Sequence, residues 1–304
     1  MRNRPSGSRV ELDIERGNIE IDGEEEIQYR RASKEGEWSM RIEVDHRAGL
    51  PGVFERKNGE VEIDAKQLHY RELNNMVKGA AAEGTKEIVL DNVYGQRYIG
   101  SGIRKSVRIQ VHGVPGNDLG AFMDGPSITV DHNAQDGVGN TMNDGVIVVH
   151  GRAGDIVGMG MRGGKIFIKE NVGYRAAIHM KEYHKRRPVL VVGGETQDFL
   201  GEYMAGGVVI VLGLGKNGSS QFNAQHIGTG MHGGQIFLRG KVEEYQLGKE
   251  AVLEPAVDED IAFIRPYVEE YIGFFGGKAE DILHTSFVKL SARSHRPFGG
   301  LYAY

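Results

Sequence analysis

The 304-residue sequence contains no cysteine. Without cysteine the chain cannot form a disulfide, supply a thiolate nucleophile or ligate an iron–sulfur cluster through sulfur. Any redox chemistry connected with this chain would therefore reside on a partner. Long hydrophobic runs are also missing, since the longest aliphatic runs, near residues 146–149 and 208–212, are far too short to span a bilayer. The first residues contain no apolar signal segment, so we expect a cytoplasmic protein.

The sequence has no excess of positive charge, because its formal net charge is −5 at pH 7. No basic block interleaved with aromatics offsets this balance, which argues against nonspecific nucleic-acid binding. Glycine, in contrast, is abundant: 45 residues are roughly twice the usual ~7%. These glycines alternate with Ile, Val and Met, which indicates many tight turns rather than disorder.

One unit recurs along the chain: a glycine, a methionine three residues later, a pair of glycines and a short β-rich run. It is clearest at residues 155–169 (DIVGMGMRGGKIFIK), 198–212 (DFLGEYMAGGVVIVL) and 225–239 (QHIGTGMHGGQIFLR). Weaker copies occupy residues 98–111, 118–130 and 136–149. The first glycine of each copy, which we call its anchor, is Gly100, Gly120, Gly139, Gly158, Gly201 or Gly228. The spacings are 20, 19, 19, 43 and 27 residues.

A period near 20 residues with one strand and several glycines is typical of a solenoid, whose units bury their apolar faces against one another. Ile166 and Ile168 alternate with Lys165, Phe167 and Lys169, which predicts a strand with one buried face. Because each coil returns the chain to the same start, the stacked strands must run parallel. We therefore predict an all-β fold, a right-handed single-stranded parallel β-helix. The wide step of 43 residues is interpreted as an insertion at residues 172–194.

The flanking segments divide the chain into four predicted regions. Residues 1–64 are polar with short alternating runs and are predicted to form strands. Residues 65–87 are predicted to form a helix that covers the open first coil. Residues 88–240 form the predicted β-helix. Residues 241–304 form a C-terminal helical segment and tail, in which a helix at 258–275 is expected to kink or restart at Pro266.

Two sets of apolar residues have defined places in the repeat. Met161, Met204 and Met231 each lie three residues after an anchor and two before a Gly-Gly pair, so we predict equivalent buried positions inside the coil. A second set lies between the inward residues of the strands and should point out of the coil. It consists of Val148, Phe167, Ile210 and Phe237. We call this set the outer stripe.

An outward apolar stripe either marks a docking face for another subunit or meets another part of the same chain. The N-terminal strands and the C-terminal tail are the intrachain alternatives. Because the stripe has charged neighbours such as Lys165 and Arg239, it resembles an interface with a dry centre and a wet margin. We predict that it contacts a partner subunit.

No motif predicts a catalytic, cofactor-binding or metal-ligating residue in this chain. The strings at residues 158–164 and 228–234 contain Gly-x-Gly-x-x-Gly, but strands follow them, whereas a dinucleotide loop opens a helix. The histidines lack the helical spacing of a zinc pair and are interpreted as polar turn residues. Those considered are His132, His179, His184, His226 and His232.

Residues 116–125 (GNDLGAFMDG), 151–173 and 201–213 (GEYMAGGVVIVLG) resemble the GXGXG repeat domain of the glutamate synthase large subunit. The second of these strings also resembles the C-type subunit of formylmethanofuran dehydrogenase. The resemblance covers about residues 88–240, and the ending at 287–302 looks like a stand-alone archaeal or anaerobe form of the domain.

The resemblance implies a noncatalytic structural and coupling subunit of a complex that makes glutamate from glutamine, 2-oxoglutarate and reductant. FMN and iron–sulfur clusters are then expected on synthase-type partner subunits, beside a glutaminase-type subunit, with none in this chain. The alternative is a C-type subunit of formylmethanofuran dehydrogenase or of another glutamate synthase-like oxidoreductase complex. A free-standing carbohydrate-active β-helix is disfavoured because no carboxylate cluster recurs along one face.

Overall fold

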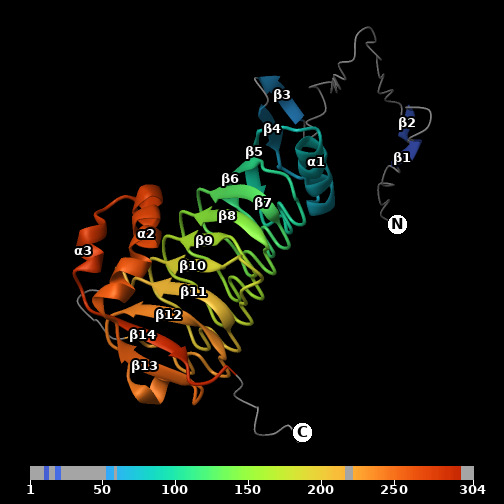
Figure 1. The fold of residues 1–304 in the computed structure, drawn as a ribbon. Coiled ribbons are helices and arrows are strands. Elements are labelled where there is room, and N and C mark those ends of the chain that lie inside the picture. Colours follow the sequence, from blue (N-terminus) through green and yellow to red (C-terminus); the bar gives the residue numbers. More distant parts are fainter. Residues whose placement is uncertain (1–9, 14–17, 22–52, 58–59, 216–221, 296–304) are drawn as a thin grey trace, which may run out of the picture. The chain divides into compact units, whose positions relative to one another are not determined.

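The computed structural model describes residues 10–13, 18–21, 53–57, 60–215 and 222–295. The chain divides into two compact units, residues 1–53 and 54–304. In the first unit the described residues form an antiparallel pair of strands, β1 (Val10–Asp13) and β2 (Asn18–Ile21). The rest of the region predicted as strands before residue 53 lies outside the described residues. The second unit contains the repeats (Figure 1).

A sheet of twelve strands runs through the repeats in the order β13-β14-β12-β11-β10-β9-β8-β7-β6-β5-β4-β3. From β4 to β12 every neighbouring pair is parallel. The prediction of a parallel β-solenoid is therefore confirmed. The strands of this array are β3 (Val53–Lys57), β4 (Glu60–Asp64), β5 (Glu87–Tyr94), β6 (Arg108–Val114), β7 (Asp124–Val130), β8 (Asp144–Val149), β9 (Lys165–Ile168), β10 (Val189–Val192), β11 (Ala205–Val211) and β12 (Gly233–Arg239).

The parallel sheet begins before the predicted residue 88, because β4 pairs with β5 across an intervening helix. That helix, α1, spans Tyr70–Ala82. Its start is capped by Glu72, whose carboxylate accepts a hydrogen bond from the His69 N–H at 3.0 Å. It ends before Gly84, whose φ of 86° favours glycine. The buried residues of α1 belong to the core inside the coil. The helix is therefore part of the first turn of the solenoid and does not only cover the open end of that turn.

The corner of each coil explains the glycine pattern. In the coil of Gly158, the backbone is left-handed at Ile156, Gly158 and Gly160, with φ values of 54°, 69° and 59°. The residue between two left-handed positions, Val157, is fully buried. The anchor N–H donates to the carbonyl of Val138 on the preceding coil at 2.8 Å. This alternation repeats in every coil from Gly100 to Gly228, and it favours glycine at three positions, each two residues from the next.

The anchor also approaches the core closely. A Cβ placed on Gly120 would lie only 2.6 Å from Cδ1 of Ile147 on β8, the strand of the following coil, so a side chain at this anchor would displace the packed interior. Met161, Met204 and Met231 are fully buried in that interior, as their shared spacing predicts.

The interpretation of residues 172–194 as an insertion is wrong. Ala177 occupies the anchor position, with a φ of 60°, and its N–H donates to the carbonyl of Val157 at 2.7 Å. Met180 follows three residues later and is fully buried, and β10 then pairs in parallel with both β9 and β11. The segment is therefore one more coil. The segment between Met180 and β10, which contains the bridge between Tyr183 and Arg186, is longer than the segment between Met161 and β9.

After β12 the chain turns back on itself. A short 3₁₀ turn (Glu244–Gln246) leads to β13 (Ala251–Pro255), and β14 (Phe287–Ala292) pairs antiparallel with both β12 and β13. Between them lie helices α2 (Asp258–Phe275) and α3 (Ala279–Leu283). The bounds of α2 match the predicted helix, and Pro266 lies within one continuous helix.

Candidate functional site

The outer stripe is covered by this chain itself. Val148, Phe167, Ile210 and Phe237 are at most 2% exposed. They form a cluster with residues of α2 and α3, including Ile264, Val268, Tyr271, Ile282 and Leu283. The prediction that the stripe contacts a partner subunit is therefore wrong for these residues. Among the described residues, the cover consists of the C-terminal helices α2 and α3.

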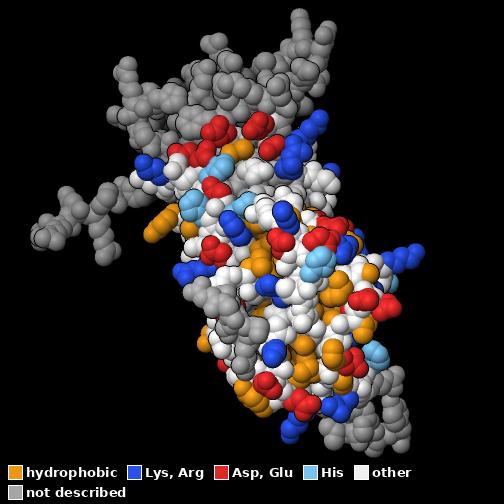
Figure 2. Space-filling view, turned by 90° about the vertical axis from the view of Figure 1, so that its left-hand side faces the viewer, with side chains coloured by type: hydrophobic (Ala, Val, Ile, Leu, Met, Phe, Trp, Pro, Cys, Tyr) orange, Lys and Arg blue, Asp and Glu red, His pale blue; other side chains and the backbone are white. Residues whose placement is uncertain are grey.

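Specific contacts hold α2 on the strands. The ring of Phe167 lies 5.1 Å from that of Phe274. Lys165 on β9 pairs with Glu270 at 2.6 Å. The hydroxyl of Tyr271 donates to the carbonyl of Lys169 at 3.0 Å. In Figure 1, α2 and α3 stand beside the later coils. On the side of the molecule that they occupy, hydrophobic side chains lie in small groups separated by charged residues (Figure 2). The apolar stripe is therefore a second core.

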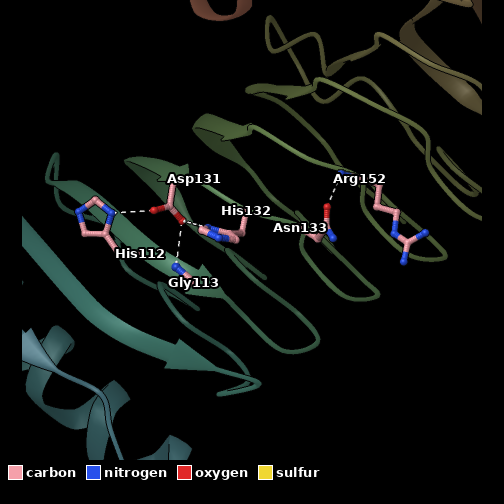
Figure 3. Close-up of polar contacts among 6 residues, drawn as sticks. All are labelled: His112, Gly113, Asp131, His132, Asn133 and Arg152. Atoms are coloured by element: carbon pink, nitrogen blue, oxygen red, sulfur yellow. Dashed lines mark hydrogen bonds and ion pairs between the residues drawn. The ribbon is translucent and has the colours of Figure 1, made fainter. Parts of the chain in front are cut away.

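The outward positions of the earlier strands are polar instead. Figure 3 shows Asp131, at the end of β7, between His112 and His132. Its carboxylate accepts from the Nδ1 atoms of these imidazoles at 2.9 Å and 2.7 Å, and from the N–H of Gly113 at 2.9 Å. Burial raises the pKa of Asp131, but the hydrogen bonds from Gly113, His132 and His112 outweigh it, so the pKa lies below its ordinary value. The group joins neighbouring coils.

A ladder of Asn and Asp side chains also joins the coils. Asn133 Oδ1 accepts from the Arg152 N–H at 3.0 Å (Figure 3). Asp136 accepts in the same way from Asp155, and Asp155 from Tyr174. Further along, Asn171 accepts from Glu195, and Asp198 accepts from Gln225. Sequence reasoning missed this ladder, although Asp136 and Asp155 are one repeat apart. Each bond satisfies a backbone N–H that the turn would otherwise leave unpaired.

The histidines considered as turn residues do not converge. His179 stacks on Tyr203, His226 stacks on Phe199, and His132 pairs with Asp131. Among the described residues no group of three or more His, Asp or Glu side chains could hold a metal ion. Gly158 and Gly228, from the strings tested as nucleotide loops, are corner residues that lead into β9 and β12.

The described residues include one hollow of about 320 Å³ beside the later coils. It is lined by Lys169, Glu170, Asn171, Gly194, Glu195, Leu214 and Gly215. The Oδ1 atom of Asn171 is already bonded to the Glu195 N–H at 2.8 Å. Its polar lining thus includes part of the ladder between coils. In the part of the chain that the structure describes, no helix has the length and apolar character needed to cross a membrane.

Comparison with known protein sequences gives two kinds of relative, a separate protein and two glutamate synthases. An uncharacterized protein, MJ1350, of Methanocaldococcus jannaschii is 48% identical over 252 residues, which cover 80% of this chain and 96% of that protein. Ferredoxin-dependent glutamate synthase 2 of Synechocystis is 29% identical over 167 residues, or 50% of this chain. The ferredoxin-dependent glutamate synthase of Pyropia yezoensis is 29% identical over 188 residues, or 57% of this chain. The matched region spans only 10% and 11% of these two synthases.

Among solved structures, the formyltransferase/hydrolase complex FhcABCD from Methylorubrum extorquens, in complex with methylofuran, contains a similar chain. The similarity covers 73% of this chain and 87% of that chain, with 18% identity and a TM-score of 0.49. Residues 68–293 match the model of the GXGXG motif. This match includes α1, all coils from β5 onward and the C-terminal helices that cover the outer stripe. The chain therefore belongs to the GXGXG motif family.

Proposed function

We propose that this chain is a noncatalytic structural subunit of a glutamate synthase-like complex. The observation that carries the proposal is the way the domain is distributed among its relatives. It matches about a tenth of two ferredoxin-dependent glutamate synthases, and nearly the whole of a separate protein, MJ1350. A domain that occurs both within a long synthase and as a separate chain can serve the same assembly in trans.

The use of polar side chains supports a structural role. Asp131, Asn133, Asp136, Asp155 and Asn171 bind the backbone or side chains of neighbouring coils. These contacts stiffen the array, because each one closes a turn against the next. A rigid array of this kind can hold two partner subunits at a fixed separation.

In this proposal the partners carry the chemistry. A glutaminase-type subunit would release ammonia from glutamine, and a synthase-type subunit with FMN and iron–sulfur clusters would use that ammonia and two electrons from a reductant to convert 2-oxoglutarate to glutamate. This chain has no cysteine to ligate an iron–sulfur cluster, and in this proposal the FMN is also held by the synthase-type subunit. The complex would work in the cytoplasm and contribute to nitrogen assimilation.

Affinity purification of the tagged full-length chain from its native host, without oxygen, tests the proposal. We expect the chain to co-purify with a flavin and iron–sulfur synthase-type subunit, identified by mass spectrometry. The purified assembly should form glutamate from glutamine, 2-oxoglutarate and reductant. A molybdopterin-containing partner would contradict the proposal and support the alternative, a C-type subunit of formylmethanofuran dehydrogenase. A chain that purifies alone would contradict both.

A further inference from the structure

Several bulky residues occupy strained backbone positions at the solenoid corners. The positions two residues before and two after each anchor are left-handed in every coil. Glycine occupies some of them, as at Gly102, Gly137, Gly160 and Gly230, and other residues, such as Phe122 and Ile156, occupy the rest. In three successive late coils, the large aromatic or cationic side chains at these positions contact one another from coil to coil. They are Arg175, His179, Phe199, Tyr203 and His226, which we call the corner patch.

The strain at these positions has a measurable size. The φ values of His179, Phe199 and Tyr203 are 55°, 64° and 53°. A left-handed conformation at a residue other than glycine costs about 1–3 kcal/mol, and such residues tend to gather at functional sites. For a bulky side chain this conformation is a clear outlier. Glycine at the same places would avoid this strain. The late coils differ from those of Phe122 and Ile156 because their strained side chains contact one another across coils.

Stacking fixes the corner patch in one arrangement. The rings of His179 and Tyr203 lie 5.3 Å apart and 10° from parallel, and those of Phe199 and His226 lie 4.9 Å apart and 12° from parallel. The guanidinium of Arg175 lies 4.8 Å from the centre of the Phe199 ring. Such pairs are worth about 0.5–1.5 kcal/mol each, so they offset only part of the strain. They also immobilise the side chains before any contact is made, which lowers the entropic cost of binding.

The corner patch remains open to solvent in the described chain, since Tyr203 is 40% exposed and His179 and His226 are exposed as well. Tyr and Arg, which are enriched at energetic centres of protein interfaces, both occur in it. Unlike the outer stripe, it is not covered by α2 or α3. A rigid, exposed aromatic surface of this kind fits a protein partner.

The charges around the corner patch specify the partner. Arg162 and Lys181 occupy matching positions on adjacent coils, where their N–H groups donate to Met142 and Met161. Both side chains are exposed, and neither makes an ion pair with another residue that the structure describes. Arg175 adds a third cation, which forms an ion pair with Glu202 at 3.6 Å within the chain. An aromatic centre with a cationic margin is complementary to an acidic segment.

We propose that the corner patch docks an acidic segment of a partner subunit, with the stacked rings at the centre of the contact and Arg162, Arg175 and Lys181 meeting its carboxylates. This inference rests on the proposed function, because it assumes that the chain assembles with a partner. It adds the surface used and the chemistry of the segment bound.

The test replaces side chains with the residue that the motif itself uses. A triple variant, His179→Gly, Phe199→Gly and Tyr203→Gly, removes the patch and relieves the strain, so we expect a melting temperature close to that of the parent. In native co-purification this variant should recover at least tenfold less partner. Phe122→Gly is the matched control, because Phe122 is 55% exposed and left-handed at the same place in an earlier coil. It should recover partner normally.

A second measurement does not depend on the stability of the variant. A photoreactive phenylalanine analogue replaces Tyr203 in the otherwise unchanged chain, and the cross-linked peptide is identified by mass spectrometry within the native complex. We expect an acidic peptide of the partner subunit.

A cross-link to a non-acidic peptide, to residues 296–304 of this chain, or to nothing would overturn the inference. So would normal partner recovery by the triple variant, and in that case the proposed function would still stand. If the parent chain itself recovers no partner, the proposed function fails, and this inference fails with it.

Discussion

Gly154→Ala tests the ladder between coils most sharply. A Cβ placed on Gly154 would overlap Oδ1 of Asp136 and would also lie 3.1 Å from the Asp136 backbone nitrogen. The Asp136 side chain would have to rotate away and abandon its 2.9 Å bond with the Asp155 N–H. Gly154 is not among the residues with positive φ, so backbone strain does not add to the effect.

The expected size follows from these two changes. Loss of a hydrogen bond to a charged group costs about 1.5–3 kcal/mol. Overpacking adds about 1 kcal/mol at the residual 3.1 Å contact. We therefore expect Gly154→Ala to lower the free energy of unfolding by about 2–4 kcal/mol. For a chain of 304 residues, this corresponds to a fall in melting temperature of roughly 3–6 °C.

A double-mutant cycle measured by denaturant unfolding isolates the cause. In an Asp136→Ala background the Oδ1 atom is gone, so Gly154→Ala should cost only about 1 kcal/mol. Gly79→Ala is the control, because a Cβ there has no atom within 4 Å, and alanine should stabilise α1 by about 0.5–1 kcal/mol. If Gly154→Ala costs the same with and without Asp136, the ladder does not act as described.

Three further outcomes are expected. Met204→Ala should lower the free energy of unfolding by about 2–5 kcal/mol in a denaturant titration, because the side chain is fully buried; an unchanged midpoint would refute the register of the coil. Phe167→Glu and Phe237→Glu should each abolish the native fold in circular dichroism and melting experiments, because α2 covers both positions; soluble variants that melt normally would contradict this cover. Burial raises the pKa of Tyr271 to about 12, so the folded chain keeps a proton that the unfolded chain loses near pH 10. Stability should therefore fall as the pH rises from about 10 to 12, and Tyr271→Phe should lessen that fall in melting curves measured against pH; an equal fall in both chains would refute this assignment.

The sequence was sufficient to predict the solenoid because its signals are local and repeated. Alternation of inward and outward residues defines the strands, and the step from anchor glycine to methionine defines the coil. The repeat pattern did not identify the coil of Ala177, because alanine occupies the anchor position there. The chain accepts the left-handed strain at that position, so a search for glycine alone cannot find it. Met180, three residues later, was the remaining signal.

The cover of the outer stripe could not be predicted in the same way. The period of the strands shows that Phe167 and Phe237 point outward, but the helix that buries them lies far along the chain. Sequence reasoning predicted that helix at residues 258–275, and α2 has these bounds. The surface against which α2 packs could not be predicted, because no local pattern links this helix to the solenoid strands. The corner patch could not be predicted for a related reason. In the sequence His179 and His226 are isolated turn residues, and only the stacking of the coils brings them against Tyr203 and Phe199.

The central claim is that this chain contributes structure, and not chemistry, to a larger complex. Its most direct test compares the purified full-length chain with the native complex that contains it, by absorption spectroscopy and by glutamate formation from glutamine, 2-oxoglutarate and reductant. The account predicts that the complex absorbs as a flavin and iron–sulfur protein and is active, whereas the chain alone is colourless and inactive. Stoichiometric flavin or cluster absorbance, or glutamate formation, by the chain alone would contradict it.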